Sequence, residues 1–185
     1  MKQIIFSVLL LTLAVFQAQA SLMDDLNKSA GGDLGAKVAD QAKEKAKAEG
    51  NKKIAAQVNA NLLVEGRKNQ CSFKSGTDEL EAGCSNKSKK LAQIIIDVKK
   101  KLQANGQSGF KFIVSGHTDS TGNATKNKEL SQRRALVMVK ELTSKGVDKT
   151  DIEAVGMGSD KMLEKPDNTP AKQAKNRRYE VQVRF

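Results

Sequence analysis

A short polar stretch in the middle of the chain carries the residues best suited to binding chemistry. Asp119 supplies a carboxylate directly after an apolar segment, and Arg133 and Arg134 supply two guanidiniums farther along the chain. A carboxylate accepts charge-assisted hydrogen bonds from an ammonium, and a planar guanidinium pairs with a carboxylate through two parallel bonds. Because both signs of charge are present, the stretch predicts a site for a small zwitterion.

Regular elements on either side must hold these charges in place. Alternating residues over 110–115 predict a strand, and loops between rigid elements concentrate binding residues. Ser131 is a suitable N-cap for a helix that ends at Gly146. This start places Arg133 and Arg134 in the first turn, where a cation beside the helix dipole is unfavourable, and therefore indicates that they face an anion.

Several motifs resemble the OmpA-like peptidoglycan-binding domain. In chain order they are Gly-His-Thr-Asp at 116–119, Gly122, Asn-x-x-Leu-Ser-x-x-Arg-Ala at 127–135, and Asn-Arg-Arg at 176–178. The resemblance covers residues 66–185. It implies an α+β two-layer sandwich of the OmpA-like βαβαβ(α)β type, with helices packed on one face of a small mixed sheet.

The resemblance also implies a ligand, the meso-diaminopimelate of peptidoglycan stem peptides. Its ammonium would be held by Asp119 and its carboxylate by Arg134. The other positions that match the family's pocket are Asn127 as a hydrogen-bonding amide, Leu130 as an apolar wall, Thr118 as a hydroxyl or backbone contact, and Arg177 as a second arginine near the ligand. The exact ligand stays open between diaminopimelate, its amidated form and another zwitterion such as glycine.

Two further residues have structural roles in this prediction. The resemblance implies that Asn176 braces the loops. His117 is the only histidine, and we expect it to hold the strand-to-loop turn through ring hydrogen bonds, with ligand contact or metal binding as the alternatives. One histidine and one aspartate do not make a metal site, so no metal and no cofactor are predicted.

The sequence departs from the family in two places. Relatives often have Gly-Arg a few residues before Asn-Arg-Arg, where this chain has Lys172 and Gln173. No cysteine follows the expected cleavage site, so the lipid attachment used by many relatives is not available there. Residues 21–65, or a partner, would then be needed to hold the domain in place.

The first twenty residues have the pattern of a secretory signal. Lys2 precedes an apolar run over 4–16, and Ala-Gln-Ala at 18–20 predicts cleavage after Ala20. The alternative is a membrane anchor, but the apolar run is short for a bilayer span. The prediction is therefore a periplasmic protein, peripheral to the outer membrane, with no integral span in the mature chain.

Cys71 and Cys84 are the only cysteines, and an even pair in an exported protein predicts a disulfide. Two cysteines thirteen positions apart lack the paired spacing of a zinc site and the Cys-x-x-Cys of a redox motif.

The formal net charge of +11 indicates affinity for polyanions. Export argues against nucleic acid, and so do the absence of tryptophan and the single tyrosine, because base-stacking platforms need aromatic side chains. A surface of solvated lysines is the simpler interpretation.

The domains are expected at 1–20 for the signal, 21–65 for an Ala/Lys-rich extension that is flexible and then helical, and 66–185 for the OmpA-like domain. Within the extension, a break at Gly50 and Asn51 separates two helices, and residues 36–64 form either a spacer or a partner-binding helix.

Inside the domain, the patterns predict strands over 63–73, 110–115, 152–156 and 179–185. They also predict helices that start at Ser85 or Asn86, at Ser131 and at Pro170.

These observations favour a non-catalytic module that binds peptidoglycan and anchors the cell envelope to the wall. The alternative is a scaffold in an envelope complex such as a stator, secretion or outer-membrane assembly. An enzyme is the least favoured, since no Ser/His/Asp set, catalytic cysteine or close carboxylate pair accompanies His117. The oligomeric state stays open.

Overall fold

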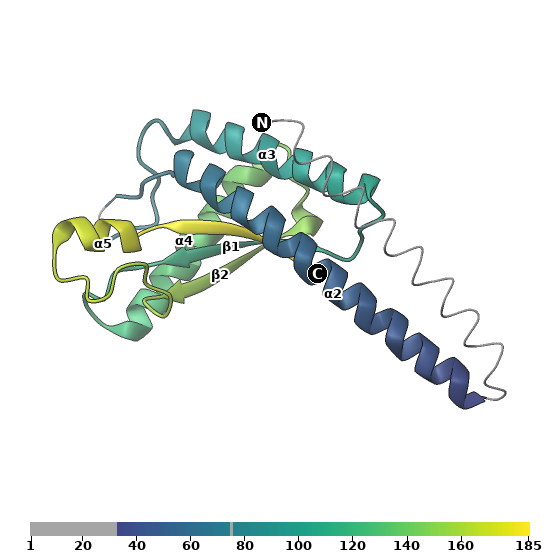
Figure 1. Ribbon diagram of the computed structural model, residues 1–185. Helices are drawn as coiled ribbons and strands as arrows, with labels where there is room; N and C mark the ends of the chain where they lie inside the picture. The colour runs from purple at the N-terminus through teal and green to yellow at the C-terminus, as the bar shows by residue number, and fades with distance from the viewer. Residues whose placement is uncertain (1–32, 75) are drawn as a thin grey trace. The chain divides into compact units, whose positions relative to one another are not determined.

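The computed structural model describes residues 33–74 and 76–185 (Figure 1). The predicted secretory signal lies outside the described residues, as does most of the flexible start. Among the described residues, those from 52 to 185 form one compact unit, and residues 33–51 do not belong to it. In the described part of the chain, no helix is both long and apolar enough to cross a bilayer.

The first described helix, α2, runs from Asp33 to Lys68. The predicted break at Gly50 and Asn51 is therefore wrong. A glycine inside a helix costs only about 1 kcal/mol relative to alanine, and the Ala, Lys and Glu residues on both sides favour the helix.

The compact unit is an α+β structure built on three strands. After α2 come α3 (Cys84–Ala104), β1 (Lys111–His117), α4 (Ala124–Ser144), η1 (Lys149–Asp151), β2 (Ile152–Gly158), α5 (Pro170–Asn176) and β3 (Tyr179–Arg184). The sheet order is β2-β1-β3, with β1 parallel to β2 and antiparallel to β3. The mixed sheet and the α+β class are confirmed.

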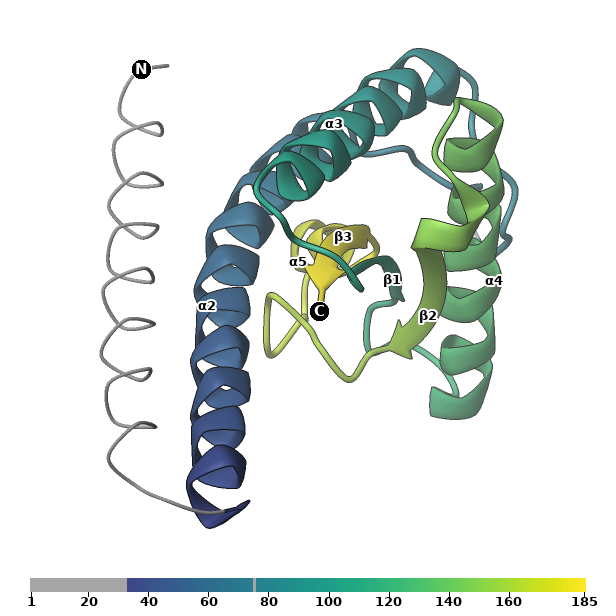
Figure 2. The same ribbon diagram turned by 90° about the vertical axis from the view of Figure 1, so that its right-hand side faces the viewer.

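One face of the sheet carries the core. Phe112 and Val114 of β1 and Val181 and Val183 of β3 are almost completely buried, and they pack in one cluster with residues of α2, α3 and α4. Figure 2 looks along the sheet, with α3 above the strands and α4 beside β2. The helices therefore form the second layer of the sandwich.

The predicted strand over 63–73 is wrong. Residues 63–68 continue α2, and Phe73 makes only an isolated bridge with Leu80. The free edge of β3 is instead met by α2, where the Asn59 amide donates to the Val183 carbonyl at 3.1 Å and accepts from its N–H at 2.6 Å. A side chain thus satisfies the backbone groups that another strand would pair with.

Helix α4 begins earlier than predicted. Asn123 is its N-cap and accepts from the Lys126 N–H at 3.1 Å, so Ser131 lies inside the helix and Arg134 lies near its middle. The first turns are polar, and apolar periodicity begins only at Leu130, which is why the pattern suggested a later start. The argument that placed cations at the helix N-terminus is therefore wrong.

Helix α4 packs directly on the backbone of β1 and β2. A Cβ at Gly116 would lie 2.2 Å from the Ser131 carbonyl oxygen, and one at Gly156 would lie 2.6 Å from the Gln132 nitrogen. The Ser131 hydroxyl also accepts from the Gly158 N–H at 2.8 Å. Glycine is required at these two positions, and it fixes how α4 presents its side chains relative to the end of β1.

Helix α3 starts one residue before the predicted caps. Gly83 is its N-cap with a φ of 87°, and Cys84 is its first residue. The predicted disulfide between Cys71 and Cys84 is present. It joins the start of α3 to the segment that follows α2.

Candidate ligand-binding site

The loop after β1 is held at the end of the central strand. The His117 N–H donates to the Arg178 carbonyl at 2.8 Å, and the Thr118 N–H donates to the Gly158 carbonyl at 2.9 Å. The backbone on each side of β1 therefore fixes the position from which Asp119 extends.

Asp119 is paired with Arg177. Its Oδ2 accepts from Arg177 Nη1 at 2.7 Å, and its Oδ1 accepts from the Thr121 N–H at 3.0 Å. The Asp119 side chain is 13% exposed and that of Arg177 is 44% exposed. The family resemblance predicted both residues as members of the site. The structure shows in addition that they form an ion pair.

Arg134 is buried and held by neutral groups. Its Nε donates to the Thr77 carbonyl at 2.8 Å, its Nη2 makes a longer 3.5 Å contact with the Lys74 carbonyl, and its guanidinium carbon lies 5.0 Å from the Phe73 ring centroid. Arg134 is 7% exposed. Among the described residues, no carboxylate forms an ion pair with it.

The electrostatics of Arg134 reflect this environment. Burial is the main cause that lowers the pKa of the Arg134 guanidinium, and repulsion from Arg177 lowers it further. Asp119 and Asp78 act in the opposite direction from a distance. The two arginines and Asp119 therefore form one electrostatic cluster with an excess of positive charge.

The other predicted pocket residues lie close to this cluster. Asn127 Nδ2 donates to the Thr121 carbonyl at 2.9 Å and to the Asp119 carbonyl at 3.4 Å. The Asn127 amide therefore stabilises the loop that carries Asp119. Leu130 is half-buried on α4. Thr118 is 4% exposed, and its hydroxyl has no hydrogen-bond partner in the described part of the chain.

A second loop supports the first. Asp167 accepts from the Ser120 N–H at 2.9 Å, from the Ser120 hydroxyl, and from Asn176 Nδ2 at 3.1 Å. The Ser120 bonds are the main cause that lowers the pKa of the Asp167 carboxyl. Asp167 was missed as a site residue, since only its place in a Pro-Asp-Asn turn marks it in the sequence.

Asn176 is completely buried and joins this second loop to α5. Its Oδ1 accepts from the N–H groups of Leu163 at 2.8 Å and Glu164 at 3.1 Å, and its Nδ2 donates to the Glu164 carbonyl at 3.0 Å. These bonds fix the residues that precede Arg177.

His117 differs from the prediction in its contacts. Its ring is 3% exposed, and neither ring nitrogen has a hydrogen-bond partner in the described residues, so the predicted ring hydrogen bonds are wrong. Glu180 lies 3.9 Å from Nε2, too far for a hydrogen bond. Burial, helped by Arg178, lowers the pKa of His117 to about 4, so the ring is neutral at pH 7.

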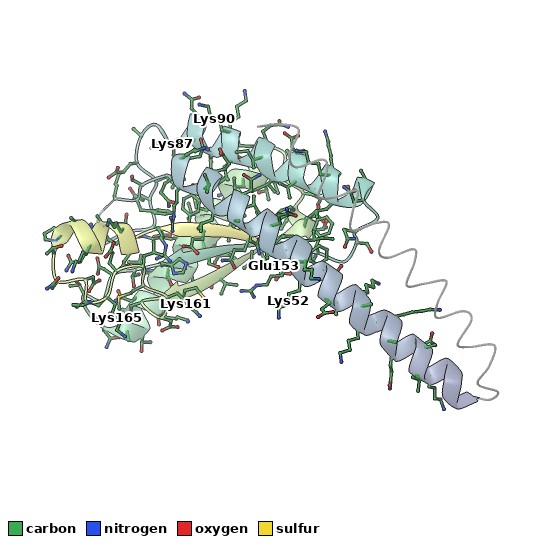
Figure 3. All side chains as sticks on the ribbon, in the orientation of Figure 1. Lys52, Lys87, Lys90, Glu153, Lys161 and Lys165 are labelled. Carbon is green, nitrogen blue, oxygen red and sulfur yellow. A yellow bond between two sulfur atoms is a disulfide. The ribbon has the colours of Figure 1, made fainter. Side chains whose placement is uncertain are left out.

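The remaining charges are spread over the surface. Figure 3 shows Lys87 and Lys90 on α3, and Lys161 and Lys165 on another side of the domain, near α5. Arg133, next to Arg134, has a half-exposed side chain 3.8 Å from Asp78. Within residues 33–74 and 76–185, no group of three His, Cys, Asp or Glu side chains is arranged to hold a metal ion.

The fold and the site together define an α+β module with a buried arginine and a loop that carries Asp119 at the end of its central strand. The OmpA family model matches residues 72–177, which is more than half of the chain. The chain belongs to the OmpA family.

Two curated relatives match part of the sequence. The peptidoglycan-binding protein ArfA of Mycobacterium tuberculosis is 37% identical over 73 residues, which are 40% of this chain and 22% of that protein. Outer membrane porin F of Pseudomonas fluorescens is 45% identical over 71 residues, which are 38% of this chain and 21% of that protein. The matched region spans about a fifth of the length of these relatives.

Solved structures share the fold. The peptidoglycan-associated lipoprotein of Burkholderia pseudomallei has a TM-score of 0.51 at 22% identity, covering 62% of this chain and 89% of its own. The C-terminal domain of Helicobacter pylori MotB, residues 125–256, has a TM-score of 0.51 at 24% identity, covering 63% of this chain and 84% of its own. At these identities the likeness speaks for the fold alone.

Proposed function

We propose that the protein is a non-catalytic module that binds the stem peptides of peptidoglycan through the zwitterionic end of meso-diaminopimelate. Asp119 accepts from the ammonium, and Arg134 donates to the carboxylate. Asn127, Leu130, Thr118 and Arg177 complete the site. The observation that carries this proposal is the burial of Arg134 without an ion-pair partner in the described residues.

A buried cation without a partner anion is costly for a folded protein. The two carbonyls and the ring that contact Arg134 offer dipoles and a quadrupole, but no negative charge. A ligand carboxylate would supply that charge through charge-assisted bonds. A bound zwitterion would leave the net charge of the cluster unchanged, because its ammonium cancels its carboxylate, but the carboxylate would give Arg134 the anionic partner that the described residues do not supply.

The ammonium is accommodated on the other side of the cluster. Asp119 uses Oδ2 for Arg177 and Oδ1 for Thr121, and a carboxylate has about four acceptor positions. An ammonium would therefore share Asp119 with Arg177 or replace it. A ligand without the carboxylate would leave Arg134 without an anionic partner, and a ligand without the ammonium would lose its bonds to Asp119, so both charges favour binding of a zwitterion.

One relative supports the class of ligand. The relative ArfA carries peptidoglycan binding in its name. The proposal places this protein in the periplasm, at the inner side of the outer membrane, linking the envelope to the wall.

Sedimentation of purified sacculi with the protein tests the proposal. Wild type is expected in the pellet, and Asp119→Asn and Arg134→Gln are expected in the supernatant. Arg184→Gln and Asp160→Asn are matched controls, since both residues are exposed, and Arg184 lies opposite Lys111, at the other end of β1 from Asp119. Retention of both site variants in the pellet would refute the site, and release of wall fragments during the incubation would refute a non-catalytic role.

Calorimetric titration with defined muropeptides identifies the head group. A diaminopimelate-containing muropeptide should bind, whereas a lysine-containing one lacks the carboxylate for Arg134 and should bind much more weakly. Amidated diaminopimelate keeps the ammonium but loses the negative charge, so it should fall between the two. Equal affinity for all three would exclude recognition of the carboxylate.

A second candidate function is a scaffold in an envelope complex, with α2 as the partner helix. The observation that favours it is that residues 33–51 of this helix do not belong to the compact unit and leave Val38 62% exposed. The predicted partner-binding segment, residues 36–64, must be shortened at its C-terminal end. Leu62 is completely buried in the core and Asn59 binds β3, so neither is free to contact a partner.

Deletion of residues 36–51 is therefore the informative change. If α2 recruits a partner, the shortened protein should still bind sacculi but should lose its position in the envelope. If the segment is only a spacer, a helix of equal length with a shuffled sequence should restore that position.

A further inference from the structure

A disulfide-closed hairpin lies against the candidate site. We call residues 71–84 the disulfide hairpin, and its described part excludes Ser75. The Cys71–Cys84 bond closes its base, the Glu81 N–H donates to the Ser72 carbonyl at 3.0 Å, and the Lys74 N–H donates to the Glu79 carbonyl at 2.9 Å. These cross-links give a short segment a defined shape without a neighbouring strand.

The hairpin supplies the polar and aromatic contacts that the described residues make to the Arg134 guanidinium. Thr77 and Lys74 accept through their carbonyls, and the Arg134 guanidinium carbon lies over the Phe73 ring. These three residues precede Arg134 by about 60 positions, and the disulfide encloses all of them. The position of the arginine therefore depends on a segment that is remote in the sequence.

This arrangement leaves part of the guanidinium for a ligand. The group has five N–H donors, of which the hairpin uses one on Nε and one on Nη2. A long side chain without such contacts samples many rotamers, and ordering it at the moment of binding weakens affinity. Because the hairpin already holds Nε and Nη2 of Arg134, this side chain loses less rotamer entropy when a ligand binds.

We propose that the disulfide hairpin is a positioning element of the ligand site, and that the Cys71–Cys84 bond sets ligand affinity by holding Arg134 in its binding orientation. The inference rests on the proposed function of the site. Thr77, Lys74 and Phe73 act through Arg134 and need not touch the ligand.

The test compares the oxidised full chain with the Cys71→Ser/Cys84→Ser variant. Calorimetric titration with the diaminopimelate-containing muropeptide should show about tenfold weaker binding by the variant. Phe73→Leu keeps the disulfide and removes the ring beside the guanidinium, so it should also weaken binding and serves if the double serine variant does not fold. Asn59→Ala is the control, because it removes hydrogen bonds at β3 and should lower stability without changing affinity.

Two readouts separate positioning from a general loss of stability. In a double-mutant cycle, the serine substitutions should weaken binding much less in an Arg134→Lys background than in wild type. In NMR spectra without ligand, the Arg134 Nε–H should exchange slowly in wild type and rapidly in the serine variant.

The outcomes distinguish this inference from the proposed function. Unchanged affinity in both hairpin variants, with wild type still binding, overturns the inference and leaves the proposed function intact. If wild type binds no muropeptide but Arg134 Nε–H protection still depends on the disulfide, the proposed function fails and the positioning of Arg134 is supported. Equal protection in both proteins overturns the positioning itself.

Discussion

The two arginines of the site are held in opposite ways. Arg177, at the end of α5, is 44% exposed and forms an ion pair with Asp119 at 2.7 Å. Arg134, in the middle of α4, is 7% exposed and contacts carbonyl groups and a ring. The Asp119 carboxylate therefore pairs with the exposed Arg177, whereas the buried Arg134 is contacted by carbonyl dipoles and an aromatic ring.

Under the proposed function, this difference suggests different roles for Arg134 and Arg177 in binding the ligand. The Arg177 side chain is half-exposed, so water competes with Asp119 and with a ligand for its guanidinium, although Asp119 itself is only 13% exposed. A buried guanidinium held only by neutral groups gains far more from an incoming carboxylate, since few water molecules compete for it. We therefore place the main recognition of the ligand carboxylate at Arg134 and an auxiliary role at Arg177.

The largest expected effect comes from moving the helix that carries Arg134. Gly116→Ala would place a Cβ 2.2 Å from the Ser131 carbonyl oxygen, so α4 must shift away from β1. We expect the free energy of unfolding in urea to fall by more than about 3 kcal/mol, together with loss of muropeptide binding.

Gly66→Ala is the matched control, because a Cβ there meets nothing within 4 Å. Since Gly66 lies in α2, the substitution should leave stability unchanged or raise it by up to about 1 kcal/mol. Equal stability of the two alanine variants would show that α4 does not depend on close contact with the sheet.

The next effect concerns pH and the buried His117 at the base of the site. Its folded pKa of about 4 lies below the ordinary value of 6.5, so between these two pH values the unfolded chain binds a proton that the folded chain does not. Stability should therefore fall as the pH drops from 6.5 to 4, by no more than about 3 kcal/mol, and should show no further histidine contribution below 4.

Urea unfolding across this pH range, with wild type and His117→Gln, measures that contribution. The variant should lose the slope between pH 6.5 and 4 while keeping the decline at lower pH that protonated carboxylates cause. An identical slope in both proteins would mean that His117 keeps its ordinary pKa in the folded state.

Replacing the two arginines compares them directly. Arg134→Gln should weaken muropeptide binding about 100-fold, which is about 2.7 kcal/mol, and Arg177→Gln about tenfold. Titration calorimetry at two salt concentrations should also show the greater salt dependence for the contribution of the exposed Arg177. A reversed order of the two losses would place the carboxylate at Arg177 instead.

The smallest effect is expected far from both arginines. Asn59→Ala removes the two hydrogen bonds to Val183 and should lower the free energy of unfolding by about 1 to 2 kcal/mol. Muropeptide affinity should stay at the wild-type value. If Asn59→Ala also lowered muropeptide affinity, affinity would follow the overall stability of the fold. The affinity losses of the Arg134 and Arg177 variants would then not reveal different roles for the two arginines.

Local patterns predicted much of this fold. The alternation of Tyr179, Val181 and Val183 identified β3, and Pro170 marked the start of α5. The residues of the site were reached through motifs whose order is typical of the family. The first predicted strand failed because its apolar residues continue the helical spacing of α2, and because Asn59 pairs with the edge that the strand would occupy.

The contacts of the site were beyond such patterns. Arg134 binds the Thr77 carbonyl and Asp119 binds Arg177, each across more than 50 positions, and Ser120 binds Asp167 across 47. Backbone carbonyls carry no signal in the sequence, since every residue has one. Only the structure shows that the Asp119 carboxylate is paired with Arg177 and does not face open solvent.

The most direct test of the central claim is a crystal structure of the protein with a diaminopimelate-containing muropeptide. The account predicts the side-chain carboxylate of diaminopimelate within hydrogen-bond distance of Arg134 and its ammonium on Asp119, with the Thr77 contact retained. A muropeptide bound elsewhere, with Arg134 still held only by the disulfide hairpin, would contradict the account.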